Sequence, residues 1–256
     1  MKRRKFIQSS VVASALPLTV INSNSDKRQP PLAPAKELYE LRTYEMKFRG
    51  DENLLADYLR NALQPALKRA GVNHFIMFRE YSQSDPANIY VLISYPDQNI
   101  YLRAQNLSSD NVYATASANY NALPPEKTIF NRYSSMLLLA FDGLPQMLEP
   151  ANDAALFELR TYEGYSEDAV RRKVKMFNDE EFPLFFEVKL NPVFFGENIA
   201  GPHRPCLTYM LNFRDMAERD ANWKTFLEHP KWKAMLVKPE YANTVNNIRK
   251  IFLKPF

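Results

Sequence analysis

An octet that occurs twice constrains this chain most. Leu38–Glu45 reads Leu-Tyr-Glu-Leu-Arg-Thr-Tyr-Glu, and Leu156–Glu163 repeats seven of those eight residues 118 positions later. The same offset aligns Pro65 with Pro183. Several landmarks at one spacing indicate two copies of one structural module. The chain has 256 residues, so each copy is close to the ~100 residues of a common domain.

The N-terminus is typical of an export signal. A twin-arginine pair, Arg3 and Arg4, precedes a weakly apolar, uncharged stretch from Val11 to Ile21. We expect residues 1–35 to be a twin-arginine (Tat) signal with a Pro-rich tether, and the mature protein to be periplasmic or secreted. Cleavage after Ala15 or after Ala35 fits the small-x-small pattern, and we favour the later site. The alternative is a disordered basic tail. A transmembrane helix is less favoured than either, because a membrane span needs ~20 apolar residues.

Signal removal changes the charge of the protein. The formal net charge is +4, but residues 1–25 carry four basic residues and no acid, so their loss brings it to zero. Cleavage after Ala35 gives −1. The basic balance therefore lies mostly in the signal, and nucleic-acid binding loses its electrostatic support. Cys206 is the only cysteine, which excludes an internal disulfide and a cysteine zinc site.

Hydrophobic periodicity predicts the same order of elements in each copy, strand-helix-strand-strand-helix-strand. Gly71 stops the first long helix, and turn residues at 84–88 separate the second and third strands. This order is that of a ferredoxin-like module. We expect an α+β fold with one module at 36–141, a linker at 142–154 and a second module at 155–256, packed sheet to sheet as a pseudo-twofold α/β barrel. The elements of the first module are expected at 37–46, 54–70, 74–81, 89–95, 98–121 and 128–139.

The repeated Glu-Leu-Arg-x-Tyr motif, at 40–44 and 158–162, resembles the NIPSNAP family. A second element, Trp-x-x-Phe-x-x-x-Pro-x-Trp, runs from Trp223 to Trp232 and occurs only in the second copy. The resemblance implies tandem NIPSNAP domains of the dimeric α/β barrel superfamily. It implies no set of catalytic residues.

The candidate site comes from the repeated strand. Alternation places Glu, Arg and Tyr of each copy on one strand face, and packing of the two sheets would bring six polar groups together in or near the barrel interior. One interpretation is a pair of structural ion pairs, which buried charges require. The other is a polar pocket in which Arg holds an anion, Glu acts as a base and Tyr donates a proton. The candidate ligand-binding residues are Glu40, Arg42, Tyr44, Glu158, Arg160, Tyr162 and His74.

Other chemistries lack a signal. His74, His203 and His229 share no ligand spacing, so we expect no metal site, and no motif predicts a phosphate loop or a resident cofactor. Trp223, Phe226 and Trp232 are interpreted as core. A wider aromatic stripe would favour homo-oligomerisation if it remained exposed. That stripe consists of Phe177, Phe182, Phe185 and Phe186.

Two classes of function fit these observations. The first is an exported, non-enzymatic module that binds a small ligand or a protein. The alternative is a cofactor-independent monooxygenase or isomerase of the α/β barrel class that acts on a small apolar or anionic substrate.

Overall fold

The computed structural model describes residues 35–81 and 86–256. The predicted twin-arginine signal therefore lies outside the described residues. Helices and strands occur where the hydrophobic periodicity predicts them, with small shifts at their ends. The strand expected from residue 128 begins at Phe130, and the helix expected at 98–121 is broken into three. The second of these helices starts after Asp110, whose side-chain oxygen caps it, and the third starts after Ser117 without a side-chain cap.

Eight strands in the described residues form one closed barrel, and every pair of neighbours is antiparallel. The order around the wall is β1-β3-β2-β8-β5-β7-β6-β4. Each half of the chain therefore contributes four adjacent strands, ordered fourth, first, third, second. The strands are β1 Leu38–Met46, β2 His74–Glu80, β3 Ile89–Tyr95, β4 Phe130–Ala140, β5 Leu156–Glu163, β6 Pro192–Ala200, β7 Cys206–Phe213 and β8 Asn247–Pro255.

Two seams join the halves. In the first, β2 pairs with β8, and Phe78 lies opposite Pro255. In the second, β4 pairs with β6, and Leu137 lies opposite Ala200. Hydrogen bonds thus link the two four-stranded sheets at both edges, so they form one continuous wall rather than two sheets that only stack. The pairing spans Phe78–Glu80 of β2 and Leu137–Ala140 of β4, and closure there reduces the length of unpaired strand edge.

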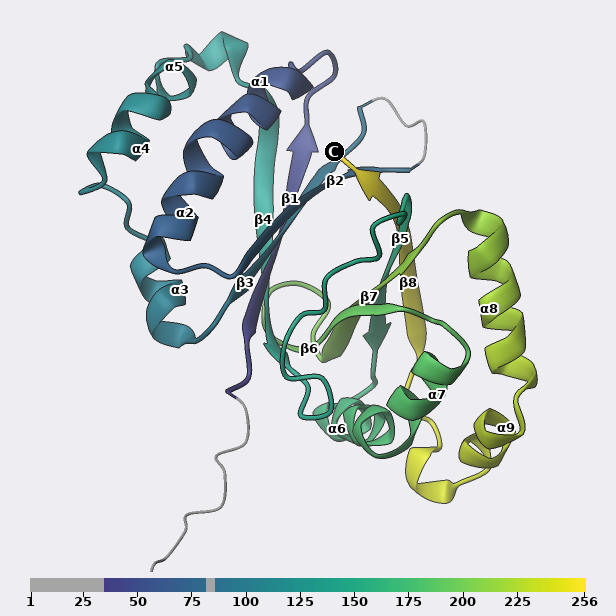
Figure 1. Cartoon of the computed structure of the whole chain (residues 1–256). Coiled ribbons are helices and arrows are strands. Elements are labelled where there is room, and N and C mark those ends of the chain that lie inside the picture. Colours follow the sequence, from purple (N-terminus) through teal and green to yellow (C-terminus); the bar gives the residue numbers. More distant parts are fainter. Residues whose placement is uncertain (1–34, 82–85) are drawn as a thin grey trace, which may run out of the picture. The chain divides into compact units, whose positions relative to one another are not determined.

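Helices cover the outside of this wall (Figure 1). Those of the first half lie against β1–β4, and those of the second half lie against β5–β8. The helices of the first half are α1 Glu52–Tyr58, η1 Leu59–Leu63, α2 Gln64–Ala70, α3 Gln98–Ala104, α4 Asn111–Ala116, α5 Ala118–Asn121 and η2 Pro125–Lys127. Those of the second half are α6 Glu167–Met176, η3 Phe177–Glu181, α7 Phe182–Glu187, α8 Met216–Glu228, α9 Pro230–Leu236 and η4 Pro239–Tyr241.

A π-helical turn recurs in both halves at the repeat offset of 118. It spans η1 in the first half and η3 in the second, and each is followed within two residues by a proline, Pro65 or Pro183. A proline inside a helix has no N–H to donate and its ring clashes with the carbonyl four residues earlier. A wider turn just before the proline accommodates that ring, so the helix continues through it.

The core has three parts. One lies between the first four strands and their helices, one lies between the second four strands and theirs, and the third fills the barrel interior. The interior core contains apolar residues from both halves. Its fully buried members include Tyr39, Phe78, Leu92, Leu138, Val193, Phe194, Met210 and Leu253.

The aromatic stripe of the second half is mostly internal. Phe177, Phe182 and Phe185 are buried, while Phe186 is half exposed. The condition for predicting an oligomer from this stripe is therefore not met. Within residues 35–81 and 86–256, no helix has both the length and the apolar character needed to cross a membrane.

Candidate functional site

The two Glu-Arg-Tyr trios lie on the outer face of the barrel wall, and they do not meet. Tyr44 packs in the core beneath the helices of the first half, and Tyr162 packs in the corresponding core of the second half. The intervening residues of these strands, such as Leu41 and Leu159, point into the interior. The expectation that six polar groups converge in the interior is therefore wrong. Alternation identifies the residues that share a face, but both faces of these strands are buried, so it does not identify the inner one.

The first trio forms a closed structural network. Arg42 donates two hydrogen bonds to Glu40, from Nε at 2.8 Å and from Nη2 at 2.9 Å. The Tyr95 hydroxyl and the Ser135 hydroxyl donate to the same carboxylate, at 2.7 and 2.6 Å. Although burial opposes the charge, these partners lower the pKa of Glu40, with Arg42 contributing most. The carboxylate is fully satisfied, and this arrangement matches the structural interpretation.

His74 is not part of either trio. It begins β2, and its Nδ1 lies 3.1 Å from the carboxylate of Glu149, whose side chain is mostly exposed. The geometry gives His74 a surface ion-pair partner rather than a place in a ligand site. The described residues hold no group of three or more His, Cys, Asp or Glu side chains arranged to bind a metal.

In the second trio the carboxylate accepts hydrogen bonds from two guanidinium groups. Glu158 is fully buried and accepts hydrogen bonds from Arg160 Nε at 2.8 Å and from Trp223 Nε1 at 2.7 Å. Arg219 on α8 adds two more, from Nε at 3.0 Å and Nη2 at 2.9 Å. Burial opposes ionisation, but these donors, led by Arg219, lower the pKa of Glu158. Two guanidinium groups therefore share the Glu158 carboxylate, and Arg219 also pairs with Asp220 at 2.7 Å.

Arg160 and Tyr162 retain unused donors. The guanidinium carbon of Arg160 lies over the Trp223 ring, 3.7 Å from its centroid, and Nη1 of Arg160 donates to the Tyr162 hydroxyl at 3.1 Å. The hydroxyl of Tyr209 donates to the same oxygen at 2.8 Å. Tyr162 thus accepts twice, and among the described residues neither its own O–H nor Arg160 Nη2 has a partner. Both donors are free for a ligand.

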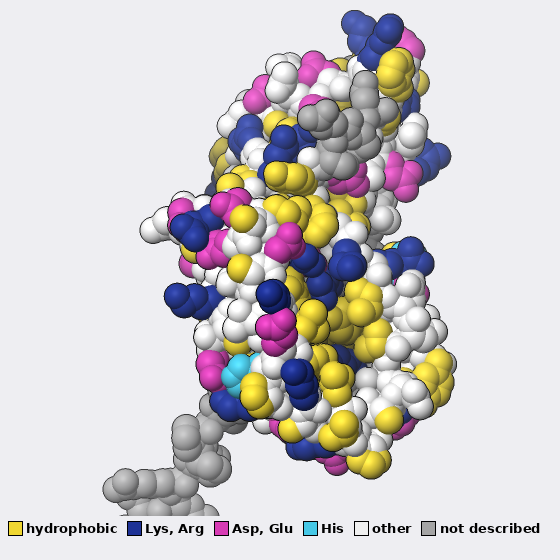
Figure 2. All heavy atoms as spheres, turned by 90° about the vertical axis from the view of Figure 1, so that its right-hand side faces the viewer, with side chains coloured by type: hydrophobic (Ala, Val, Ile, Leu, Met, Phe, Trp, Pro, Cys, Tyr) yellow, Lys and Arg dark blue, Asp and Glu magenta, His cyan; other side chains and the backbone are white. Residues whose placement is uncertain are grey.

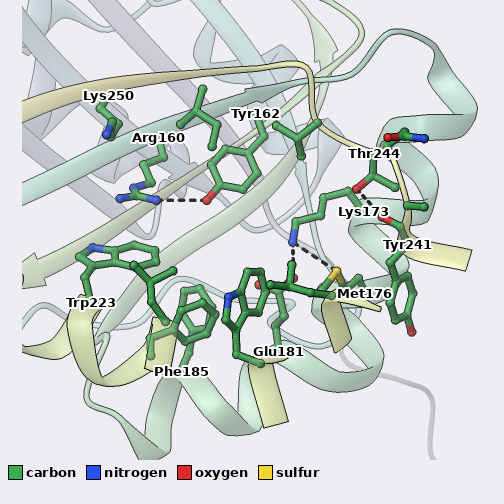
Figure 3. A pocket seen from close by; sticks show the side chains of 18 of the residues that line it. Arg160, Tyr162, Lys173, Met176, Glu181, Phe185, Trp223, Tyr241, Thr244 and Lys250 are labelled. Atoms are coloured by element: carbon green, nitrogen blue, oxygen red, sulfur yellow. Dashed lines mark hydrogen bonds and ion pairs between the residues drawn. The ribbon is translucent and has the colours of Figure 1, made fainter. Parts of the chain in front are cut away.

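These donors lie in the wall of a cavity of about 570 Å³ between β5, β8 and the helices of the second half, which we call the Arg160 cavity (Figure 3). Its volume is that of a small-molecule site. Hydrophobic and basic side chains gather together on the face of the molecule that carries α8 and α9 (Figure 2). The residues that line it include Arg160, Tyr162, Lys173, Met176, Glu181, Phe185, Arg219, Trp223, Trp232 and Lys250.

A buried ion pair forms another part of the wall. Lys173 on α6 contacts the carboxylate of Glu181 at the end of η3, and their side chains are 5% and 2% exposed. Figure 3 shows the pair between Tyr162 and Met176. The Lys173 ammonium also lies 4.5 Å from the ring centroid of Phe177. Burial raises the pKa of Glu181, although Lys173 acts in the opposite direction.

Among the residues that the structure describes, the first half has no equivalent of this site. At the positions 118 residues earlier, Leu55 replaces Lys173 and Leu63 replaces Glu181, and both leucines are buried. Tyr58 stands at the position of Met176 and stacks on Tyr120 with ring centroids 3.8 Å apart. Aromatic rings thus pack where the second half is open. A separate hollow of about 880 Å³ in the first half lies beside α5 and β4 and touches neither trio.

Sequence reasoning therefore found part of the site. Arg160 and Tyr162 were candidates and line the cavity, whereas Lys173 and Glu181 were missed. Trp223 and Trp232 were interpreted as core only, yet both also line the cavity. One signal was available, because two leucines of the first copy become an ionisable pair in the second.

The fold indicates the structural class of the protein. The chain has a mixed α/β fold built around an antiparallel β-barrel. It is similar to a provisionally assigned monooxygenase from Fusobacterium nucleatum, at 10% identity and a TM-score of 0.55, over 86% of this chain and 93% of that one. A provisionally assigned monooxygenase from Lactobacillus acidophilus gives 11% identity and a TM-score of 0.53, over 85% and 93%. At such identities the likeness shows the fold alone.

The sequence of the second half matches a known family. Residues 157–256 match the NIPSNAP family, so the second half carries a NIPSNAP domain. An uncharacterised NIPSNAP domain protein from Burkholderia xenovorans is 19% identical over 40% of this chain and 94% of that one, with a TM-score of 0.35. No curated protein matches the chain.

Proposed function

We propose that the second half of the chain binds a small anion with an apolar, flat body in the Arg160 cavity. The observation that carries this proposal is the charge of the lining. Four cationic side chains, Arg160, Lys173, Arg219 and Lys250, line the cavity with one carboxylate, that of Glu181. Glu158 behind them and Asp220, which pairs with Arg219, supply two more carboxylates, so one positive charge remains uncompensated.

The apolar part of the lining favours a flat ligand body. Phe185, Trp223 and Trp232 line the cavity, and their side chains present aromatic surface without a charge of their own. Arg160 Nη2 and the Tyr162 hydroxyl supply directional donors, which suit a carboxylate or a similar oxyanion. A ligand of this kind would neutralise the excess charge and bury its ring against the aromatic side chains.

The chain supplies its own reporter for the test. Its two tryptophans, Trp223 and Trp232, both line the cavity. Titration with phenylacetate should therefore change the intrinsic tryptophan fluorescence in a saturable way. The neutral isostere phenylacetamide should bind more weakly, and added salt should weaken phenylacetate binding alone. A chain that responds to neither compound, or equally to both, would refute the proposal.

Two variants test the charge directly. Arg160→Met should raise the Kd for phenylacetate roughly 10–100-fold, because a hydrogen bond to a charged group contributes about 1.5–3 kcal/mol. Lys250→Met removes an exposed cavity charge and should raise it roughly twofold to fivefold. Lys254→Met is the matched control, since Lys254 is exposed on the same strand but does not line the cavity.

We also infer that the first half is a second, diverged NIPSNAP-like copy, so that the chain is a tandem of ferredoxin-like modules. Support comes from the shared Glu-Leu-Arg-x-Tyr motif, the π-helical turns 118 residues apart and the strand order fourth, first, third, second in each half. An experimental structure with another strand order would contradict this inference.

Export through the twin-arginine pathway remains a proposal that rests on Arg3 and Arg4. Replacement of both by lysine should keep the protein inside the cell, while the N-terminal sequence of the exported protein distinguishes cleavage after Ala15 from cleavage after Ala35. Equal export of the two forms would refute it. Homo-oligomerisation also remains a prediction, which sedimentation at several protein concentrations tests.

A further inference from the structure

We propose that Glu181 and Lys173 make the Arg160 cavity a proton-transfer site, in which a carbonyl compound bearing an anionic group is enolised and isomerised. This inference rests on the binding role proposed above and adds a reaction to it.

The position of the pair is the first argument. Glu181 and Lys173 are almost fully buried, yet both line the cavity, and their charged ends meet each other at its wall (Figure 3). Aromatic rings surround the ammonium of Lys173, with the Phe177 and Trp232 centroids at 4.5 and 5.4 Å. Charges in such surroundings interact strongly with a ligand, because little water screens them.

The repeat supplies the second argument. The first half builds the same strand, helix and π-helical turn with Leu55 and Leu63 at the corresponding positions. The fold therefore does not need a buried ion pair here, and an apolar pair of similar size often gives equal or higher stability. The costly pair occurs only in the half that has the cavity. π-Helical turns are also frequent at functional sites.

The chemistry follows from the groups present. Burial raises the pKa of Glu181, which makes its carboxylate a stronger base than an ordinary one. It would remove a proton from the carbon next to the carbonyl. The C–H electrons form a carbon–carbon double bond, and the carbonyl electron pair moves to oxygen. Glu181 then returns a proton to the original carbon or to a conjugated one, and the proton that it carries can exchange with solvent before this return. No oxidant or other co-reactant is consumed.

The neighbouring donors would stabilise the enolate oxygen. The Lys173 ammonium lies 5.8 Å from the Tyr162 ring centroid, and the O–H of Tyr162 has no acceptor among the described residues. A cation and a preorganised hydroxyl donor aimed at developing negative charge lower the barrier to enolisation. Arg160, which is hydrogen-bonded to Tyr162, would hold the anionic group of the substrate.

The test uses the full chain and phenylpyruvate, which combines a ring, a carboxylate and an acidic methylene group. Proton NMR in D₂O measures exchange of the methylene protons, and tryptophan fluorescence measures binding in the same samples. The wild-type protein should accelerate exchange above the buffer rate. Glu181→Gln should reduce the acceleration by about 100-fold or more, while the Kd stays within roughly threefold or becomes tighter. Asp179→Asn, an exposed change on the same turn, should leave exchange unchanged.

The outcomes separate the two proposals. Saturable binding with no acceleration, or with acceleration that survives in Glu181→Gln, overturns the proton-transfer role and leaves the binding role intact. No binding of phenylacetate or phenylpyruvate overturns both. The Lys173→Leu/Glu181→Leu variant, which copies the first half, guards against misfolding as an explanation. It should remain folded and be as inactive as Glu181→Gln, and full activity in this variant also overturns the inference.

Discussion

Replacing Lys173 by leucine should strongly destabilise the protein. Lys173 and Glu181 form an ion pair whose side chains are 5% and 2% exposed. Loss of the ammonium leaves a carboxylate in an apolar environment without its cation, which costs about 3–5 kcal/mol. Leucine fills much of the vacated space, as Leu55 does in the first half, so the charge dominates the effect. For a domain of this size, the Tm should fall by roughly 6–20 °C.

The double variant Lys173→Leu/Glu181→Leu should recover most of that loss. It places at both positions the residues that the first half already has, and replacing a buried ion pair by apolar residues is often neutral. Urea unfolding of the wild type, both single variants and the double variant gives the coupling free energy. Lys175→Leu is the matched control, because its exposed ion pair with Asp179 contributes less than about 1 kcal/mol. A double variant as unstable as Lys173→Leu would refute this reasoning.

The pH dependence of the Lys173→Leu variant gives an independent check. Burial raises the pKa of Glu181, and loss of Lys173 removes the group that opposes this rise. The folded state then binds the proton more tightly than the unfolded state, whose carboxyl pKa is about 4.3. The penalty is therefore absent at low pH and grows as the pH rises above that value. The variant should be closer to wild-type stability at pH 5 than at pH 8, and a constant difference would contradict the assignment.

Three further predictions concern the rest of the fold. Trp223→Phe keeps a ring but removes the N–H that donates to Glu158, so unfolding in urea should show a loss of about 1–3 kcal/mol, and no loss would mean that the bond contributes nothing. Because the pKa of Glu158 is lowered in the folded protein, its ionised carboxylate stabilises the fold at a pH above the unfolded pKa of about 4.3, and this stabilisation is lost as the pH falls through the folded pKa. Glu158→Gln should therefore reduce the loss of stability that acid causes in the wild type. Gly196→Ala should destabilise the barrel by about 1–3 kcal/mol, since the added Cβ would lie 2.7 Å from Cβ of Leu138, and an unchanged Tm would show that the wall relaxes easily.

Local signals in the sequence are sufficient to predict most of the helices and strands. Alternation predicted the strand at Leu38–Met46, and the helical period with Gly71 as its stop predicted the helix that ends at Ala70. These signals depend on neighbours within a few residues, so no tertiary information is needed to read them. The breaks within 98–121 were missed, although Asp110 is a readable N-cap.

The assignment of faces needed the tertiary structure. Tyr39 and Tyr44 are 0% and 2% exposed, one inside the barrel and one beneath the helices. A strand covered on both sides has no polar face that marks the outside, so its sequence pattern is symmetric with respect to the two faces. The contact between Trp223 and Glu158 joins residues 65 positions apart and likewise follows from the fold rather than from any local motif.

Differences between the two copies carry more functional information than their identities. The shared octet keeps the wall and its Glu-Arg pair in both halves, and in the first half that pair is fully satisfied by local donors. The changes from Leu55 to Lys173 and from Leu63 to Glu181 place two ionisable groups where the same backbone accepts leucine. Such a change makes folding less favourable, and sites that break a local folding rule in this way are often functional. Both charges line the Arg160 cavity, whereas neither Leu55 nor Leu63 lines the two hollows of the first half, so we propose a ligand in that cavity as the reason for both charges.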